Sequence, residues 1–171
     1  MMTTTPQTNH IIDSDGFELH AEDEAAMRQE MAHYEQPQAA CIDALKIVQR
    51  RHGWVPDKAI GAIARVLGIG PGEVEGVATF YSLIFRQPVG RHIVLVCDSS
   101  TCFLSGFNEL RQALVNQLGV DYGQTTEDDR FTLLPVCCLG ACDGAPALMI
   151  DDDTYGPVTA DDLPALLENY P

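Results

Sequence analysis

This chain of 171 residues has no long apolar run, few basic residues and no cysteine pair with the C-x2-C spacing. No run approaches the roughly 18 apolar residues that a helix needs to cross a bilayer, so direct membrane insertion is not expected. Ten Lys and Arg stand against 25 Asp and Glu, which gives a net charge of −15. This charge argues against nucleic acid and anionic membrane surfaces as partners.

Export signals and nucleotide-binding motifs are missing as well. The first residues show no basic segment followed by an apolar one, so we expect no signal peptide. Without export, the six cysteines are better interpreted as thiolate ligands than as three disulfides. No G-x-G-x-x-G follows a predicted strand and no Walker motif occurs, which leaves no recognisable nucleotide site. A thiol–disulfide oxidoreductase is disfavoured because it needs C-x-x-C at a helix N-terminus.

What the sequence does contain is two close cysteine pairs in its second half. Cys97 and Cys102 bracket four residues, and the doublet Cys137-Cys138 is soon followed by Cys142. Structural zinc sites favour C-x2-C, whereas wider and unequal spacings suit a 2Fe–2S cluster, in which each pair holds one iron. Zinc and disulfides remain as alternatives. Adjacent side chains in extended backbone point opposite ways, so only one member of the doublet is expected to face the metal.

The first half has the hydrophobic period of helices. Residues 1–17 are polar and predict a disordered arm, and residues 18–87 predict a helical bundle without a chemical motif of its own. Its helices are expected at 21–34, at 38–52, between the turn at 54–57 and Gly68, and at 72–84. The glycines at 68–72 are interpreted as a helix end and a turn, not as a phosphate loop. Cys41 falls in the second of these helices and is interpreted as structural.

From residue 88 the pattern becomes that of an α/β protein. The apolar run 93–96 predicts a strand buried on both faces, which delivers Cys97 to the strand end where ligand sites of open α/β sheets lie. Further elements are expected as strands at 120–126, 131–136 and 147–150, a helix at 107–118, and a last helix after residues 159–162. Cys102 is expected just before the helix at 107–118. The three aspartates at 151–153 lack EF-hand spacing and predict a solvated hairpin turn.

The pattern C-x4-C with Cys138-Leu139-Gly140-Ala141-Cys142 resembles the family of thioredoxin-like 2Fe–2S subunits of NADH:quinone oxidoreductase, the E subunits of respiratory complex I. Other stretches that resemble this family are ALKIVQ at 44–49, HGWVP at 52–56, EGVATFY at 75–81, PVG at 88–90, GQTT at 123–126 and FTL at 131–133. The cysteine doublet and residues 85–92 most resemble the proteobacterial version. The family's second pair reads C-L-G-x-C, which selects Cys138 and leaves Cys137 as a small buried hydrophobe.

The resemblance implies an N-terminal helical bundle followed by a thioredoxin-like α/β 2Fe–2S ferredoxin domain at residues 88–171. It implies one low-potential 2Fe–2S cluster on Cys97, Cys102, Cys138 and Cys142, and no catalytic residue on this chain. Such a cluster moves single electrons, so the hydride of NADH requires a flavin. The resemblance therefore places FMN and NADH on a partner subunit, next to further iron–sulfur subunits of the peripheral arm.

The same resemblance implies a subunit of the NADH dehydrogenase (translocase) that is cytoplasmic and peripheral to the inner membrane as part of its complex. An alternative is the homologous 2Fe–2S diaphorase subunit of a soluble NAD-reducing hydrogenase or an NAD-dependent formate dehydrogenase. A third class, a zinc-stapled interaction module, would be colourless. Asp98 and Asp143 adjoin ligand cysteines, and their charges oppose an added electron, so we expect a low reduction potential.

Overall fold

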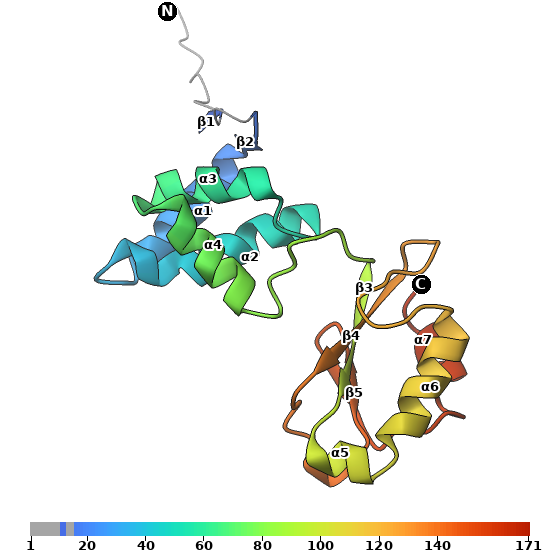
Figure 1. Cartoon of the computed structure of the whole chain (residues 1–171). Helices are drawn as coiled ribbons and strands as arrows, with labels where there is room; N and C mark the ends of the chain where they lie inside the picture. The colour runs from blue at the N-terminus through green and yellow to red at the C-terminus, as the bar shows by residue number, and fades with distance from the viewer. Residues whose placement is uncertain (1–10, 13–15) are drawn as a thin grey trace, which may run out of the picture. The chain divides into compact units, whose positions relative to one another are not determined.

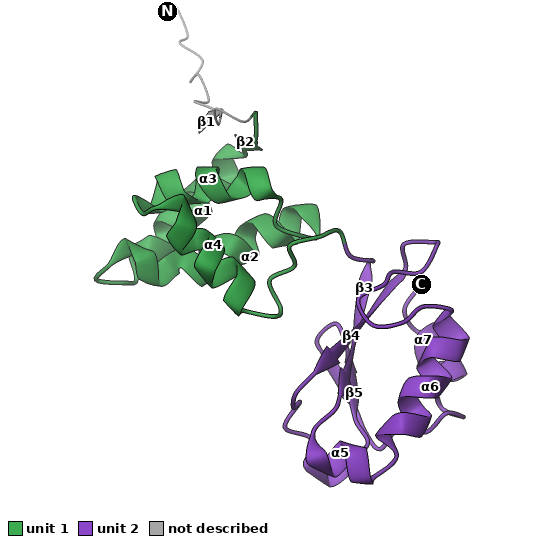
Figure 2. Cartoon of the chain, viewed as in Figure 1, with its two compact units in different colours: residues 1–88 green, residues 89–171 purple. Residues whose placement is uncertain are grey.

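The computed structural model describes residues 11–12 and 16–171. Within it the chain divides into two compact units, residues 1–88 and residues 89–171, which Figure 2 colours separately. Most of the arm predicted at residues 1–17 lies outside the described residues. The described part of it includes the strand β1 (Ile11–Ile12), which pairs antiparallel with β2 (Glu18–Leu19).

The first unit is built from short helices around one apolar core (Figure 1). Its elements are α1 (Ala21–Met31), the 3₁₀ turn η1 (Pro37–Ala40), α2 (Cys41–His52), α3 (Asp57–Leu67) and α4 (Pro71–Phe80). The helices α2 and α3 end at glycines in the left-handed conformation, Gly53 with φ 79° and Gly68 with φ 70°, as predicted. The helices α1 and α4 end earlier than predicted. In α4 the reason is Tyr81, whose backbone is extended at φ −89° and ψ 110°.

Arginine ion pairs join these helices. Arg51 of α2 forms a bidentate pair with the buried Asp23 of α1, at 2.5 and 2.8 Å. Arg86 fixes the segment after α4, because its guanidinium donates to Asp57 at 2.7 Å and to Glu75 at 2.8 Å. The last residues of this unit are therefore held in place although they form no helix.

The second unit is a four-stranded sheet with helices packed against it. Its strands are β3 (His92–Cys97), β4 (Phe131–Val136), β5 (Leu148–Ile150) and β6 (Asp153–Tyr155), in the order β4-β3-β5-β6. Its helices are α5 (Ser100–Leu104), α6 (Phe107–Leu118) and α7 (Leu163–Glu168), with a 3₁₀ turn η2 (Cys142–Gly144). The strand β3 is parallel to β4 and antiparallel to β5. Figure 1 shows α6 and α7 side by side on one side of the sheet, where they share its core.

The central strand β3 confirms the interpretation of the run 93–96. Val94, Leu95 and Val96 are buried, and hydrogen-bonded strands flank them on both sides. The turn predicted at the three aspartates is also confirmed, because Asp151 and Asp152 connect β5 to β6. Asp151 adopts φ 53° there, and its carboxylate accepts a hydrogen bond from the Ile93 N–H at 2.9 Å.

Two predicted elements of this unit are wrong in detail. Residues 120–126 form no strand beyond one isolated bridge, Thr125 to Thr132, because the left-handed Gly123 and the Gln124 cap on Asp121 N–H turn the chain. Cys102 does not precede the long helix directly. It lies in a short helix of its own, α5, which Gly106 at φ 111° separates from α6. Among the residues that the structure describes, none of the helices is long and apolar enough to span a bilayer.

Candidate iron–sulfur site

Two parallel strands bring the cysteines of the second unit to one edge of the sheet. Cys97 is the last residue of β3, and its register partner Val136 is the last residue of β4. The doublet Cys137-Cys138 therefore follows directly at the same edge. Cys102 returns to this edge from α5, five residues beyond Cys97. The topology thus explains how distant cysteines come to lie near one another.

The first pair, Cys97 and Cys102, is buried. Their side chains and Ala147 form a small apolar cluster against the half-buried Leu139 and Ala141. Burial alone raises the pKa of the Cys97 thiol, but the N–H groups of Ser99 and Leu139 and the Cys102 thiol bring that pKa below its ordinary value.

The pKa of Cys102 moves in the opposite direction from that of Cys97. Burial raises it, the Ala147 N–H partly opposes this, and neighbouring Cys97 and Cys142 raise it further. The two neighbouring thiols thus have pKa values shifted in opposite directions, and backbone N–H groups point at both sulfurs. This is an environment that stabilises negative charge on sulfur.

The second pair lies on the exposed loop that follows β4. Cys138 Sγ accepts a hydrogen bond from the Gly140 N–H at 3.3 Å, and Gly140 makes this possible with φ 76°. Cys142 opens η2, and its charge is close enough to raise the pKa of Cys102. The structure therefore brings Cys97, Cys102 and Cys142 together. In the described part of the chain, the hydrogen bond from Gly140 is the only one to Cys138.

The prediction that Cys137 is a small buried hydrophobe is wrong. Its side chain is exposed, as are those of Cys138 and Cys142. The alternation argument does not apply because β4 ends at Val136, before the doublet. Cys137 contributes its backbone instead, since its carbonyl lies 4.0 Å from Cys97 Sγ.

Cys41 behaves as predicted, as part of the core of the first unit. It is 3% exposed, and burial together with Glu73 raises its pKa to about 11. Such a thiol is inert as a ligand at neutral pH.

A backbone contact that the sequence does not reveal anchors the second ligand loop. Gly144 packs directly on Gly156, so a Cβ on Gly156 would lie 2.1 Å from the Gly144 carbonyl oxygen. The Val158 N–H also donates to the Pro146 carbonyl at 3.0 Å. These contacts fix the chain just after Cys142.

The donor set fits a 2Fe–2S group. Four of the five thiols at this edge belong to two closely spaced pairs, on β3–α5 and on the loop after β4. Within the described residues no three His, Cys, Asp or Glu side chains surround a single point as ligands of one ion would. Two pairs, each of which holds one iron, do not require such a point. The N–H donors at Cys97, Cys102 and Cys138 suit a group that carries negative charge on sulfur.

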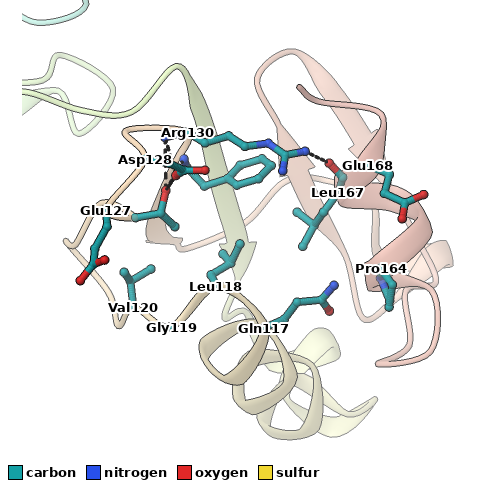
Figure 3. Close-up of a pocket in the computed structure, with 12 residues that line it drawn as sticks. Gln117, Leu118, Gly119, Val120, Glu127, Asp128, Arg130, Pro164, Leu167 and Glu168 are labelled. Atoms are coloured by element: carbon teal, nitrogen blue, oxygen red, sulfur yellow. Dashed lines mark hydrogen bonds between the residues drawn. The ribbon is translucent and has the colours of Figure 1, made fainter.

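A separate cavity of about 630 Å³ lies at the other end of β4 (Figure 3). Arg130 crosses it over the Phe131 ring, and its guanidinium donates to the Leu167 carbonyl at 2.6 Å and to the Tyr170 carbonyl at 2.5 Å. The cation thus caps the C-terminal end of α7. The lining residues include no cysteine or histidine, and we assign no chemistry to this cavity.

Comparisons with known proteins agree on one family. The model of the thioredoxin-like [2Fe-2S] ferredoxin family matches residues 27–171. The E subunit of NADH-quinone oxidoreductase from Pseudomonas aeruginosa is 59% identical over 162 residues, which are 95% of this chain and 98% of the relative. The protein of the same name from Escherichia coli strain K12 is 57% identical over 157 residues, 92% of this chain and 95% of the relative.

Among solved structures, an NAD+-reducing [NiFe]-hydrogenase in the H2-reduced state matches with a TM-score of 0.63 and 25% identity. The match covers 74% of this chain and 22% of the hydrogenase chain.

These matches define the class as a thioredoxin-like 2Fe–2S fold with mixed helices and a small sheet. The chain belongs to the thioredoxin-like [2Fe-2S] ferredoxin family and, within it, to the E subunits of NADH-quinone oxidoreductase. The resemblance stated from the motifs is therefore confirmed, as are the single 2Fe–2S cluster and the role as a subunit of an oxidoreductase complex.

Proposed function

We propose that Cys97, Cys102, Cys138 and Cys142 hold the 2Fe–2S cluster, with one iron on each pair. The observation that carries this proposal is the buried Cys97–Cys102 pair, at which the N–H groups of Ser99, Leu139 and Ala147 already point. Cys142 is the best-supported member of the second pair because its charge reaches Cys102. Cys138 completes the set through the C-L-G-x-C motif, and Cys137 is left out.

We further propose that this chain passes electrons between its cluster and the FMN of an NADH-binding partner subunit. Bound here, a 2Fe–2S cluster supplies one-electron transfer. The residues of this chain set the reduction potential of the cluster. N–H groups stabilise negative charge on sulfur, whereas the exposed Asp98 and Asp143 beside the ligands oppose further negative charge. The second effect favours a low reduction potential.

The partners that this function requires are the FMN- and NADH-binding subunit and further iron–sulfur subunits of the peripheral arm. The proposed location is cytoplasmic, on the periphery of the inner membrane as part of the complex. The net charge of −15 supports protein partners and argues against nucleic acid.

We assign the helical bundle domain, residues 18–87, a docking role toward the flavin subunit, after an arm at 1–17 and before the cluster domain at 88–171. It contains none of the four proposed ligands, and the end of α4 and the turn after it expose Phe80 at 79%, Tyr81 at 43% and Leu83 at 49%. A fragment of residues 88–171 should retain the cluster and bind the flavin subunit much more weakly than the full chain. If the fragment binds the flavin subunit as strongly as the full chain does in a pull-down, the docking role of the bundle is wrong.

The test of the main proposal is reduction by NADH. The chain loaded with its cluster is mixed with the purified flavin subunit, and the reduced-cluster EPR signal is followed after NADH is added. We expect the signal only when both proteins are present. A signal without the flavin subunit, or none with it, would contradict the proposal.

The similarity to the hydrogenase structure supports one alternative, a diaphorase subunit of a soluble NAD-reducing enzyme. Purification of the chain from its native cells discriminates between the two. Co-purifying membrane subunits support NADH-quinone oxidoreductase, and a hydrogenase or formate dehydrogenase subunit in their place supports the alternative.

A further inference from the structure

The short helix α5 exposes two large apolar side chains directly after a proposed cluster ligand. Leu104 is 86% exposed and Phe103 is 55% exposed, whereas Cys102 is 2% exposed. Cys102 is the one buried residue of this five-residue helix. We call the exposed pair, Phe103 and Leu104, the α5 tip. Phe103 leans on the buried Phe107 ring, with the ring centroids 6.2 Å apart, but more than half of it stays exposed, and Leu104 is almost fully exposed. Two adjacent large apolar side chains in solvent are typical of a contact surface.

The α5 tip lies at the same edge of the sheet as the second ligand pair. Cys102 packs with Ala147 and against Leu139 and Ala141 of the ligand loop, so α5 contacts that loop through its buried side. Cys138 and Cys142 on the loop are exposed. Apolar side chains and ligand thiols therefore lie at the same end of the unit, and both are exposed to solvent there.

The second unit as a whole carries a large negative charge. Residues 89–171 contain three arginines and no lysine against 13 Asp and Glu, a net charge of −10. All three arginines are engaged elsewhere: Arg91 with the Asp128 carbonyl, Arg111 with Asp121, and Arg130 with carbonyls at the end of α7.

The carboxylates nearest the α5 tip along the chain and at the ligands are Asp98, Glu109 and Asp143. All three are exposed, and within the described residues none of these carboxylates has a hydrogen bond or an ion pair. A protein that covers this end must therefore supply the cations.

We propose that the α5 tip inserts into an apolar socket with a border of Lys or Arg on the flavin-bearing subunit. This inference rests on the proposed function, since it names the surface through which that partner reaches the cluster. Burial of Leu104 and Phe103 in the socket excludes water from the exposed ligand loop and places the partner one residue from Cys102. The exposed carboxylates of Asp98, Glu109 and Asp143 steer the basic border to this end.

The test uses the full chain with its cluster and the purified flavin subunit. Leu104→Asp should weaken binding about tenfold or more, the loss expected when a central apolar anchor is replaced by a charge. The matched control Leu104→Met keeps an apolar side chain of similar size and should bind like the unmodified chain. Iron content, the EPR signal and the melting temperature should be unchanged in both variants, because Leu104 is 86% exposed and is not one of the proposed ligands. The association rate of the unmodified chain should fall as salt is raised.

Each outcome decides a separate point. If the unmodified chain does not bind the flavin subunit, the proposed function itself is overturned. If it binds and Leu104→Asp binds equally well, only the socket is overturned. A second copy of this chain is the other possible occupant, and sedimentation tests it. If the unmodified chain self-associates and Leu104→Asp abolishes this while binding to the flavin subunit stays intact, the tip belongs to an interface between two copies of this chain. If the association rate does not depend on salt, the proposed border of Lys or Arg on the partner is wrong.

Discussion

The contact between Gly144 and Gly156 makes the cluster site sensitive to one methyl group outside the ligand set. A Cβ at Gly156 would lie 2.1 Å from the Gly144 carbonyl oxygen and 3.0 Å from its carbonyl carbon. A Cβ at Gly144 would in turn meet the Gly156 backbone at 2.9 Å. All these atoms belong to the backbone, so no side-chain rotation can relieve the overlap. Gly156→Ala must therefore displace one of the two segments.

The displacement can be compared with what a metal site tolerates. Real Cβ atoms essentially never approach closer than 3.0 Å, so the 2.1 Å contact must lengthen by about 0.9 Å. Metal–ligand distances hold to within about 0.2 Å. One of the two segments, the one that contains Gly144, joins Cys142 to Ala147, whose N–H points at Cys102. Overpacking of this kind costs about 1–3 kcal/mol, and in a domain of this size each kcal/mol lowers Tm by about 4–8 °C.

We expect Gly156→Ala to lose iron or to broaden and shift the reduced-cluster EPR signal, and to melt at a lower temperature. Gly144→Ala should do the same, because it closes the same contact from the other side. The matched control is Gly76→Ala in α4, where the added Cβ has no heavy atom within 4 Å other than its chain neighbours and its own helix backbone. It should be neutral or stabilising by up to about 1 kcal/mol, as for alanine in a helix interior. Full iron content with an unmodified EPR spectrum in Gly156→Ala would refute the reasoning.

Three further predictions test other parts of the structure. Serine at each proposed ligand, Cys97, Cys102, Cys138 and Cys142, should weaken or abolish the EPR signal, whereas Cys41→Ser and Cys137→Ala should retain it; a full signal in any of the first four removes that residue from the ligand set. The raised pKa of Cys41, about 11 against its ordinary 9.0, should favour the folded state fully below pH 9, and this contribution should disappear as the pH rises through about 11. Denaturation curves across this range should show a slope that Cys41→Ala reduces, and an equal slope in both proteins would contradict the assignment. Arg130→Met should cost about 1.5–3 kcal/mol by urea unfolding, since it leaves the Leu167 and Tyr170 carbonyls without their charged donor; a loss below about 0.5 kcal/mol would contradict this.

The sequence pattern correctly predicted the elements that depend only on residues close together in the chain. The run 93–96 became a central strand because apolar, mostly β-branched residues suit two covered faces, and Gly53 and Gly68 end helices because they adopt positive φ. The ligand spacing and its motif led to the family. These features depend on neighbours within a few residues, which a sequence displays directly.

The elements that the sequence did not predict depend on where the chain goes next. Cys137 is exposed because β4 stops at Val136, and its neighbours alone do not reveal that end. The strand expected at 120–126 gave way to a turn held by Gln124 and by hydrogen bonds to Leu133. The Gly144–Gly156 contact joins two segments twelve residues apart through backbone atoms, so no periodicity marks it.

The two halves of the ligand set are supported in different ways, and this difference connects the predictions. Cys97 and Cys102 are buried against Ala147 and are held by the central strand and α5, so their sulfurs are positioned by the core. Cys138 and Cys142 lie on an exposed loop, which Gly140 turns and the Gly144–Gly156 contact anchors from behind. The binding energy of the cluster must therefore order the exposed pair, Cys138 and Cys142, more than the buried pair. A partner that covers the α5 tip would exclude water from that same half. The backbone contact and the proposed socket therefore both act on this loop, and its two cysteines are where loss of either should first be detected.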